Sequence, residues 1–357
     1  MSWILVVLVA ALLFVLEKLW APTALRALRF KGGCDRLLAE PGEPVLWSAV
    51  VENQSRLPIP FARLREHFPL VAQPKAEQKW IDAHCQRSIQ QWSVEEKLSL
   101  KPLQRCTRTV SLVFPRRGAY QIGNYRLSVG DLLGFKERGK EGDSQKLVVI
   151  PERARNQKAL VALGGFLGDI SVRRFILEDP ILTVGFRDYT GREPLKAVSW
   201  TRTAMTGTMQ VKQYDHTAEQ TVMILLDLEG GTAVETEACF RLMRSVCEQL
   251  EQKKIPFGMR TNGNLPGPVG KVFYMSEGLG SSHLNTILYA LGQADNTCFY
   301  SFRYLVKQTL EHRKNNESYI VITPSLTEEN RTLLRTLETA VGNPLCILTG
   351  ALEVEDA

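Results

Sequence analysis

The stretch TVMILLDL, residues 221–228, decides how the C-terminal half of the chain folds. Five consecutive apolar residues follow the threonine before Asp227 interrupts them. A run that is apolar at every position, rather than at alternate positions, is typical of a strand buried on both faces. We therefore expect residues 221–228 to form the central strand of a sheet that carries helices on both sides.

The residues after this strand alternate between helical and strand patterns. From residue 236 to residue 254, apolar residues recur at four-residue spacing, which predicts a helix with one apolar face. Further helices are expected at residues 282–291, 302–313 and 326–341, and further strands after Pro256, at residues 319–323 and at residues 345–349. This alternation predicts a doubly wound α/β domain over residues 218–357, with ligands at the carboxyl ends of its strands.

The end of the first strand resembles a degenerate metal site. Asp227, Glu229 and Gly231 occupy the positions of the Asp-x-Ser-x-Ser motif with which von Willebrand A-type domains hold Mg²⁺. Both serines are replaced, and Pro324 stands where a second aspartate is expected. Mg²⁺ demands near-octahedral oxygen ligation, so one or two carboxylates bind it weakly. We expect a von Willebrand A-like domain without a cofactor, and a weak magnesium site at Asp227 and Glu229 is the alternative.

Residues 32–155 have the pattern of strands and turns instead. The turn signal EPGEP, residues 40–44, precedes a strand-like run at residues 45–51. A second strand is expected at residues 109–114, and the last one ends before Pro151. Strands at this spacing, without long helical periodicity, predict a small antiparallel β-sandwich.

An apolar segment opens the chain. Residues 3–16 are uninterrupted apolar sequence, and a helix over residues 2–20 is about 28 Å long at about 1.5 Å per residue, close to the thickness of a bilayer core. Positive charge follows this segment rather than preceding it, which argues against a cleaved signal peptide. By the positive-inside rule, the same charges place the rest of the chain in the cytoplasm. We expect a single-pass transmembrane anchor with a basic flank at residues 1–31, and hence a cell-membrane protein with the lipid bilayer as a partner.

Composition excludes several classes of protein. Hydrophobic residues make up 44% of the chain and charged residues 23%, which is ordinary for globular protein and argues against long disorder. A net charge of +6, dispersed along the chain, does not predict nucleic-acid binding. The seven cysteines form no Cys-x-x-Cys pair, so reduced thiols are favoured over a zinc site.

The most distinctive stretch lies in a connecting segment, residues 156–217. VGFRDYTGREPLKAVSWTRTAMTGTMQVKQYD, residues 184–215, concentrates arginines and aromatic residues just before the first central strand. We interpret it as a polar, partly buried network in which guanidinium groups pair with Asp188 or stack on aromatic rings. It serves as a partner-binding surface, as an inter-domain latch, or as both. The candidate residues are Arg187, Asp188, Tyr189, Gly191, Arg192, Trp200 and Arg202.

This stretch resembles the hallmark of domain-of-unknown-function family 58, the von Willebrand A-like membrane proteins associated with MoxR-type AAA+ ATPases. Arg192 replaces an acidic residue of the family pattern, and Met205 replaces its final arginine. PRRGAYQIGNYRLSVGDLLGF, residues 115–135, resembles a second family segment, with Leu132 in place of a proline. The chain therefore resembles a divergent member of this family. The matching hallmark positions are Arg187, Asp188, Tyr189, Gly191, Trp200, Thr203 and Ala204.

The resemblance implies a membrane-anchored, non-enzymatic scaffold or adaptor in an envelope-associated assembly, with a MoxR-type AAA+ ATPase and neighbouring membrane proteins as partners. An extracellular metal-dependent adhesion module is the first alternative, and it requires the opposite membrane orientation and a working metal site. A hydrolase is the second alternative. His216 beside Asp215 resembles a base with its orienting carboxylate, but adjacent residues on a strand point to opposite faces. Because metalloprotease, nucleophile-elbow and Walker A motifs are missing from the sequence, we predict no catalytic residue.

Overall fold

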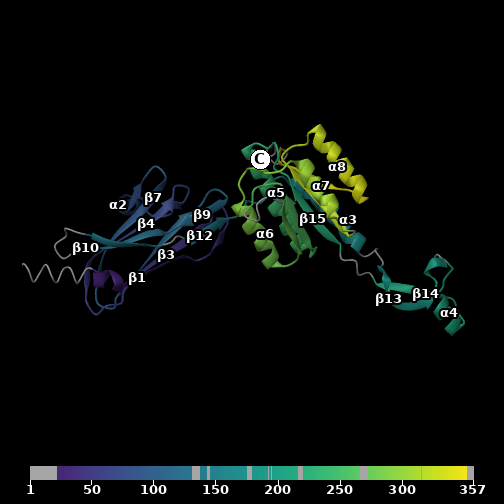
Figure 1. Ribbon diagram of the computed structural model, residues 1–357, viewed down its shortest axis with the longest axis horizontal. Helices are drawn as coiled ribbons and strands as arrows, with labels where there is room; N and C mark the ends of the chain where they lie inside the picture. The colour runs from purple at the N-terminus through teal and green to yellow at the C-terminus, as the bar shows by residue number, and fades with distance from the viewer. Residues whose placement is uncertain are drawn as a thin grey trace, which may run out of the picture. The chain divides into compact units, whose positions relative to one another are not determined.

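The structure is a computed structural model that describes residues 22–130, 137–142, 145–174, 179–191, 193, 195–215, 220–265, 272–314 and 316–351. The chain forms two compact units, which divide between Glu152 and Arg153. The N-terminal unit is built from mainly antiparallel sheets, and the C-terminal unit contains a mixed, largely parallel sheet with helices (Figure 1). The protein is thus a multi-sheet α/β protein with β-sandwich regions.

Three sheets form the described part of the N-terminal unit. The first has the order β1-β3-β8-β5, from Leu28–Cys34, Pro44–Asn53, Arg105–Val113 and Gln73–Pro74. The second has the order β11-β10-β4-β7-β6, from Glu137–Gly142, Asn124–Gly130, Ile59–Pro69, Gln91–Leu100 and Cys85–Arg87. The third has the order β2-β12-β9, from Leu38–Ala39, Gln145–Val149 and Gly118–Ile122. A short helix, α2 (Gln78–His84), precedes β6.

The predicted strands at residues 45–51 and 109–114 are confirmed as β3 and β8. The segment around α2, β6 and β7 showed no clear strand pattern in the sequence, and β6 and β7 join the second sheet. The β region starts earlier than residue 32, since β1 begins at Leu28 and pairs with β3.

Aromatic side chains fill the centre of the N-terminal unit. Trp47 meets Phe68 edge-on with ring centroids 6.0 Å apart, and Phe68 stacks on Trp92 at 4.7 Å. These three rings come from β3, β4 and β7 and belong to one buried cluster. Because buried aromatic rings remove much apolar area from water, this cluster is a main source of the unit's stability.

A charged pair also lies inside this unit. Glu66 on β4 is fully buried and accepts a hydrogen bond from Trp47 Nε1 at 2.7 Å. Arg108 on β8 pairs with Glu66 and, at 3.1 Å, with Glu96 on β7. Burial lowers the pKa of Arg108 to about 10. A buried carboxylate is tolerated only when it is paired, so these contacts tie the first sheet to the second.

One five-stranded sheet organises the C-terminal unit, with the order β17-β16-β15-β18-β19. Its strands are β15 (Thr221–Leu226), β16 (Phe257–Thr261), β17 (Phe273–Gly278), β18 (Glu317–Thr323) and β19 (Cys346–Thr349). Its helices are α3 (Gln157–Arg174), α5 (Ala233–Gln252), α6 (Ser281–Gln293), α7 (Phe302–Glu311) and α8 (Glu328–Val341). The predicted elements are confirmed, but β17 and α3 were missed, and β17 pairs antiparallel with β16 at the sheet's edge.

The apolar run of β15 is buried on both faces, as expected. Met223 and Leu225 pack in one cluster with residues of α7 and α8, whereas α5 contacts β15 and β18. Figure 1 shows β15 between α5 and α7. α5 begins at a capping box in which Thr232 and Glu235 exchange hydrogen bonds, which satisfies amides that the first helical turn leaves unpaired.

Across the described residues, no helix combines the length and apolar character needed to cross a bilayer. The apolar part of the predicted anchor, residues 1–21, lies outside the described residues. Residues 22–27 are helical and lead into β1.

Candidate functional site

The segment singled out in the sequence folds as two paired strands and a helix. β13 (Asp179–Asp188) and β14 (Gln210–Asp215) run antiparallel, and α4 (Trp200–Thr206) lies between them in sequence, after a 3-10 turn at Leu195–Ala197. Figure 1 shows these elements as one group. We call residues 179–215 the hallmark module. α4 ends at Gly207, whose φ of +75° suits glycine at a helix C-terminus.

Glu193 organises the turn after β13. Its carboxylate accepts hydrogen bonds from Thr190 N at 3.1 Å and from Thr190 Oγ1 at 2.8 Å. Arg187 Nη1 lies 2.6 Å from the same carboxylate. The bonds from Thr190, aided by Arg187, lower the pKa of Glu193 to about 2. Sequence reasoning missed Glu193, although the spacing Thr-x-x-Glu, which lets a side chain cap a turn, was a usable signal.

The polar network differs from the one predicted for this segment. Stacking of a guanidinium on an aromatic ring is confirmed, because the Arg202 guanidinium lies over the Phe186 ring, 5.0 Å from its centroid. Among the described residues, the polar contacts of Asp188 and Arg187 are with other groups. Asp188 accepts a hydrogen bond from Gln210, and Arg187 pairs with Glu193.

The remaining candidate residues take backbone or exposed positions. Tyr189 is half-buried and its amide donates to Met209 O at 2.8 Å. Gly191 has a φ of +85°, which glycine adopts without strain. Arg192 lies outside the described residues.

Trp200 is exposed, which corrects the prediction of a partly buried ring. Its exposed fraction is 62%, and that of Met205 is 74%. Val198 points inward instead and forms a bridge with Val211. Among the side chains of residues 185–212 whose burial is described, those buried are Val198, Ser199 and Val211. This part of the module therefore presents large apolar side chains outward.

A second polar site lies at the carboxyl edge of the five-stranded sheet. Asp227 follows β15, and its carboxylate is fully buried. It accepts hydrogen bonds from Asn262 Nδ2 at 2.7 Å, from Thr323 Oγ1 at 2.8 Å and from Glu229 N at 3.0 Å. Burial raises the pKa of Asp227, and these donors oppose the rise. Three neighbouring strands thus supply the groups that satisfy one carboxylate.

The residues present do not fit a magnesium ion. Both oxygens of Asp227 already accept protein hydrogen bonds, and Glu229 Oε2 accepts from Phe302 N at 2.6 Å, at the N-terminus of α7. A Cβ atom on Gly231 would stand 2.7 Å from Pro324 side-chain atoms, so a serine hydroxyl has no room there. Glu229 therefore caps a helix, where a carboxylate is favoured by the helix dipole. The described residues contain no cluster of three or more acidic, histidine or cysteine side chains suited to a metal ion.

Comparison with known proteins identifies no family. No family model matches this chain, and no curated protein matches it. Among solved structures, it aligns with AvmM, which catalyzes macrocyclization in alchivemycin A biosynthesis, at 14% identity over 35% of this chain and 91% of that one, with a TM-score of 0.24. It also aligns with the sporulation control protein Spo0M from Bacillus subtilis, at 11% identity over 46% of this chain and 58% of that one, with a TM-score of 0.21. A non-cellulosomal cohesin from the archaeon Archaeoglobus fulgidus aligns at 12% identity over 34% and 86%, also with a TM-score of 0.21. TM-scores this low carry no functional argument, so the resemblance to family 58 stays a prediction.

Proposed function

We propose that this protein is a membrane-anchored, non-enzymatic scaffold that binds a MoxR-type AAA+ ATPase through the hallmark module. The exposure of Trp200 and Met205 carries the proposal. Tryptophan, methionine and arginine are enriched at protein interfaces, and tryptophan and arginine dominate their binding energy. In the module these three residue types lie on one short helix, α4, as Trp200, Arg202 and Met205.

The exposed apolar side chains among the described residues of the module support an interaction role. A two-stranded hairpin is marginally stable in water unless it packs against something else. Leu195 and Phe186 add to its exposed apolar area. Burying these side chains against a partner gains hydrophobic free energy.

Two further observations support a cytoplasmic scaffold over the alternatives. The apolar segment at residues 3–16 is followed by basic residues, which favours an N-terminal anchor with both units in the cytoplasm. The order of parallel strands and helices around β15 is consistent with a von Willebrand A-like domain, and the donor set at Asp227 does not suit metal-dependent adhesion. Partner choice comes from the resemblance to family 58, in which these parts occur beside a MoxR-type ATPase.

The test is co-purification of the tagged full-length protein in mild detergent with crosslinking. Arg187→Ala and Trp200→Ala are compared with Phe299→Ala, which removes an equally exposed ring from the C-terminal unit outside the module. A hot-spot side chain contributes about 2 kcal/mol or more to binding, so we expect ATPase recovery to fall at least about tenfold for Trp200→Ala. The melting temperature should stay close to that of the wild type, because the ring is exposed.

Two outcomes contradict the proposal. One is the absence of any AAA+ ATPase among the crosslinked proteins of the wild type. The other is unchanged ATPase recovery in both module variants, or an equal loss in Phe299→Ala.

A further inference from the structure

One end of the N-terminal unit gathers three segments that are far apart in the sequence. Residues 22–27 contact the β3–β4 turn, where Gln54 N donates to Ala27 O at 2.9 Å. The β7–β8 turn joins them, because Leu103 N donates to Ser55 O at 3.1 Å. We call these three segments the basal surface. It consists of residues 22–27, 53–58 and 101–104.

Asn53 ties the two turns of the basal surface together. Its side chain is fully buried, and its amide nitrogen donates to Leu57 O at 2.9 Å and to Lys101 O at 3.0 Å. Its amide oxygen accepts from Ser55 N at 3.0 Å and from Ser55 Oγ at 2.7 Å. The two hydrogens and two acceptor sites of the amide are therefore all used within the protein. This arrangement holds the tips of the turns in a defined position.

Large apolar side chains project from the basal surface. Leu57 is 57% exposed and Leu103 is 65% exposed. Leu103 also has a φ of +57°, in the left-handed region that favours glycine over a residue with a side chain. A leucine that faces solvent in this conformation contributes nothing to the core, which points to a contact outside the protein.

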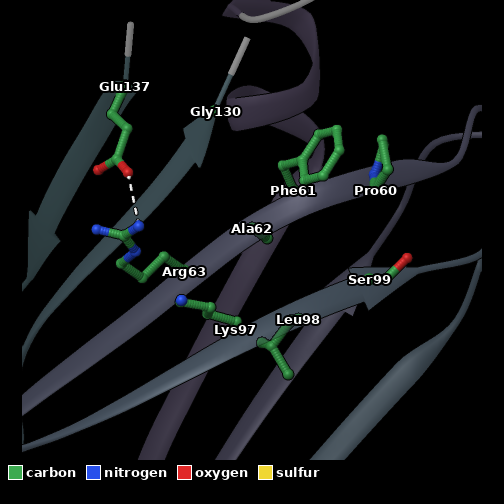
Figure 2. A pocket seen from close by; sticks show the side chains of 9 residues that line it. All are labelled: Pro60, Phe61, Ala62, Arg63, Lys97, Leu98, Ser99, Gly130 and Glu137. Carbon is green, nitrogen blue, oxygen red and sulfur yellow. Dashed lines mark ion pairs between the residues drawn. The ribbon is translucent and has the colours of Figure 1, made fainter. Parts of the chain in front are cut away.

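The apolar character continues onto the adjoining strand. Phe61 at the start of β4 is exposed and forms a wall of a hollow of about 220 Å³. Figure 2 shows the ring beside this hollow, with the Arg63–Glu137 ion pair at 3.1 Å on another side. The hollow lies at the same end of the unit, because Ile59 pairs with Leu100 just before the β7–β8 turn.

Basic residues outnumber acidic residues around Leu57 and Leu103. Residues 22–29, 52–58 and 101–105 contain one acidic residue, Glu52, which lies between two arginines in the strand register. Exposed leucines among basic residues are typical of surfaces that rest on anionic bilayers. The exposed basic residues of these stretches are Arg26, Arg29, Arg56, Lys101 and Arg105.

We propose that the basal surface binds anionic lipid headgroups, with Leu57 and Leu103 reaching below the phosphates. The inference rests on the proposed function in one respect, namely the membrane anchor. The apolar segment at residues 3–16 leads in sequence into residues 22–27, so an inserted anchor brings this end of the unit to the lipid. The sign of the charge and this proximity favour lipid over a protein partner. Contact with the headgroups then orients the N-terminal unit on its anchor.

The experiment uses the full-length protein in vesicles of phosphatidylcholine, with or without about 30% phosphatidylglycerol to supply negative surface potential. A photoreactive benzophenone amino acid is placed at position 57, 103 or 89. Position 89 is the matched control. Ile89 is 92% exposed, but it lies in the β6–β7 turn, at the end of β7 opposite to the basal surface. We expect lipid adducts at positions 57 and 103 to exceed those at 89 about tenfold, and to decrease at high salt, which screens headgroup attraction. Equal lipid labelling at all three positions, or adducts with protein in place of lipid at 57 and 103, overturns the inference.

Variants separate this inference from the anchor. Leu103→Gly should fold, because glycine adopts the left-handed backbone conformation of this position without strain. The double variant Arg56→Glu and Lys101→Glu should also fold, because both side chains are exposed and the change reverses only their charges. With both charges reversed, we expect adducts at position 57 to fall at least about fivefold, while resistance to alkaline extraction from the membrane stays unchanged. If the double variant keeps both its lipid adducts and its resistance to alkaline extraction, the lipid-binding surface is contradicted but the anchor is not. If alkali extracts the wild-type protein from the membrane, the anchor of the proposed function is contradicted.

Discussion

Replacement of Asp227 tests how the carboxyl edge of the five-stranded sheet is built. Asp227→Ala removes a buried acceptor and leaves Asn262 Nδ2 and Glu229 N without their partner. Thr323 Oγ1 loses one acceptor but keeps Ser325 O at 3.2 Å. A buried donor left unpaired costs about 1–3 kcal/mol, and Asn262 Nδ2 is such a donor, so we expect a loss of about 1–3 kcal/mol. For a unit of this size that is a decrease of about 2–12 °C in melting temperature.

Asp227→Asn changes the charge and keeps the shape. The amide oxygen accepts the same bonds from Asn262 and from Glu229 N, and the amide nitrogen donates to Thr323 Oγ1, whose hydrogen turns to Ser325 O. The existing donors keep their acceptors and the cost of burying a charge disappears, but the second amide hydrogen has no acceptor among these contacts. We therefore expect this variant to be more stable than Asp227→Ala at neutral pH.

The pH dependence has a defined sign. Burial raises the pKa of folded Asp227 above its unfolded value, so the native state binds this proton more tightly than the unfolded state does. Stability from this group is therefore greatest at low pH, decreases as pH rises from the unfolded pKa of about 3.9 to the folded pKa, and is level above it. Asp227→Asn lacks this dependence, so its stability relative to the wild type should increase across that window and then stay constant.

Urea unfolding of the full-length protein, followed by the helical circular dichroism signal, measures these differences. The comparison is made across the acidic and neutral range, with a chelator and with added Mg²⁺. Two results refute the reasoning. The first is an Asp227→Asn variant as unstable as Asp227→Ala. The second is a stabilisation of the wild type by Mg²⁺ that Asp227→Asn abolishes, because it makes the carboxylate a metal ligand.

Three further predictions concern packing and charge. Gly231→Ser places a Cβ atom 2.7 Å from Pro324 and should cost about 1–3 kcal/mol in thermal unfolding, rather than restoring Mg²⁺ binding. Glu66→Ala leaves Arg108 buried without one acceptor and should cost about 3–5 kcal/mol in urea unfolding, whereas removing an exposed carboxylate from the outer face of the same sheet should cost less than about 1 kcal/mol. Because the pKa of folded Glu193 is low, the turn keeps its hydrogen bonds at pH values above the unfolded pKa and loses them as pH falls toward about 2. A Glu193 carboxyl resonance that titrates near pH 4 in an NMR titration contradicts this prediction.

The sequence alone determined which segments form the central elements. The apolar run of β15 predicts burial on both faces because every position is apolar, and the structure buries both faces. α5 and α8 were predictable because apolar spacing and capping residues are local properties of the chain. β17 was not, since an exposed edge strand has no apolar run and depends on its neighbour β16.

Only the tertiary structure decided how the polar groups are satisfied. The partners of Asp227 come from strands that lie far apart in the sequence, and the sequence offered Glu229 as a metal ligand where the structure makes it a helix cap. The exposure of Trp200 and the charge of Glu66 inside the sandwich depend likewise on which neighbour occupies the facing position. Local periodicity reports whether a position is buried, but a hydrogen bond between distant segments requires the register and crossovers that the folded chain alone defines.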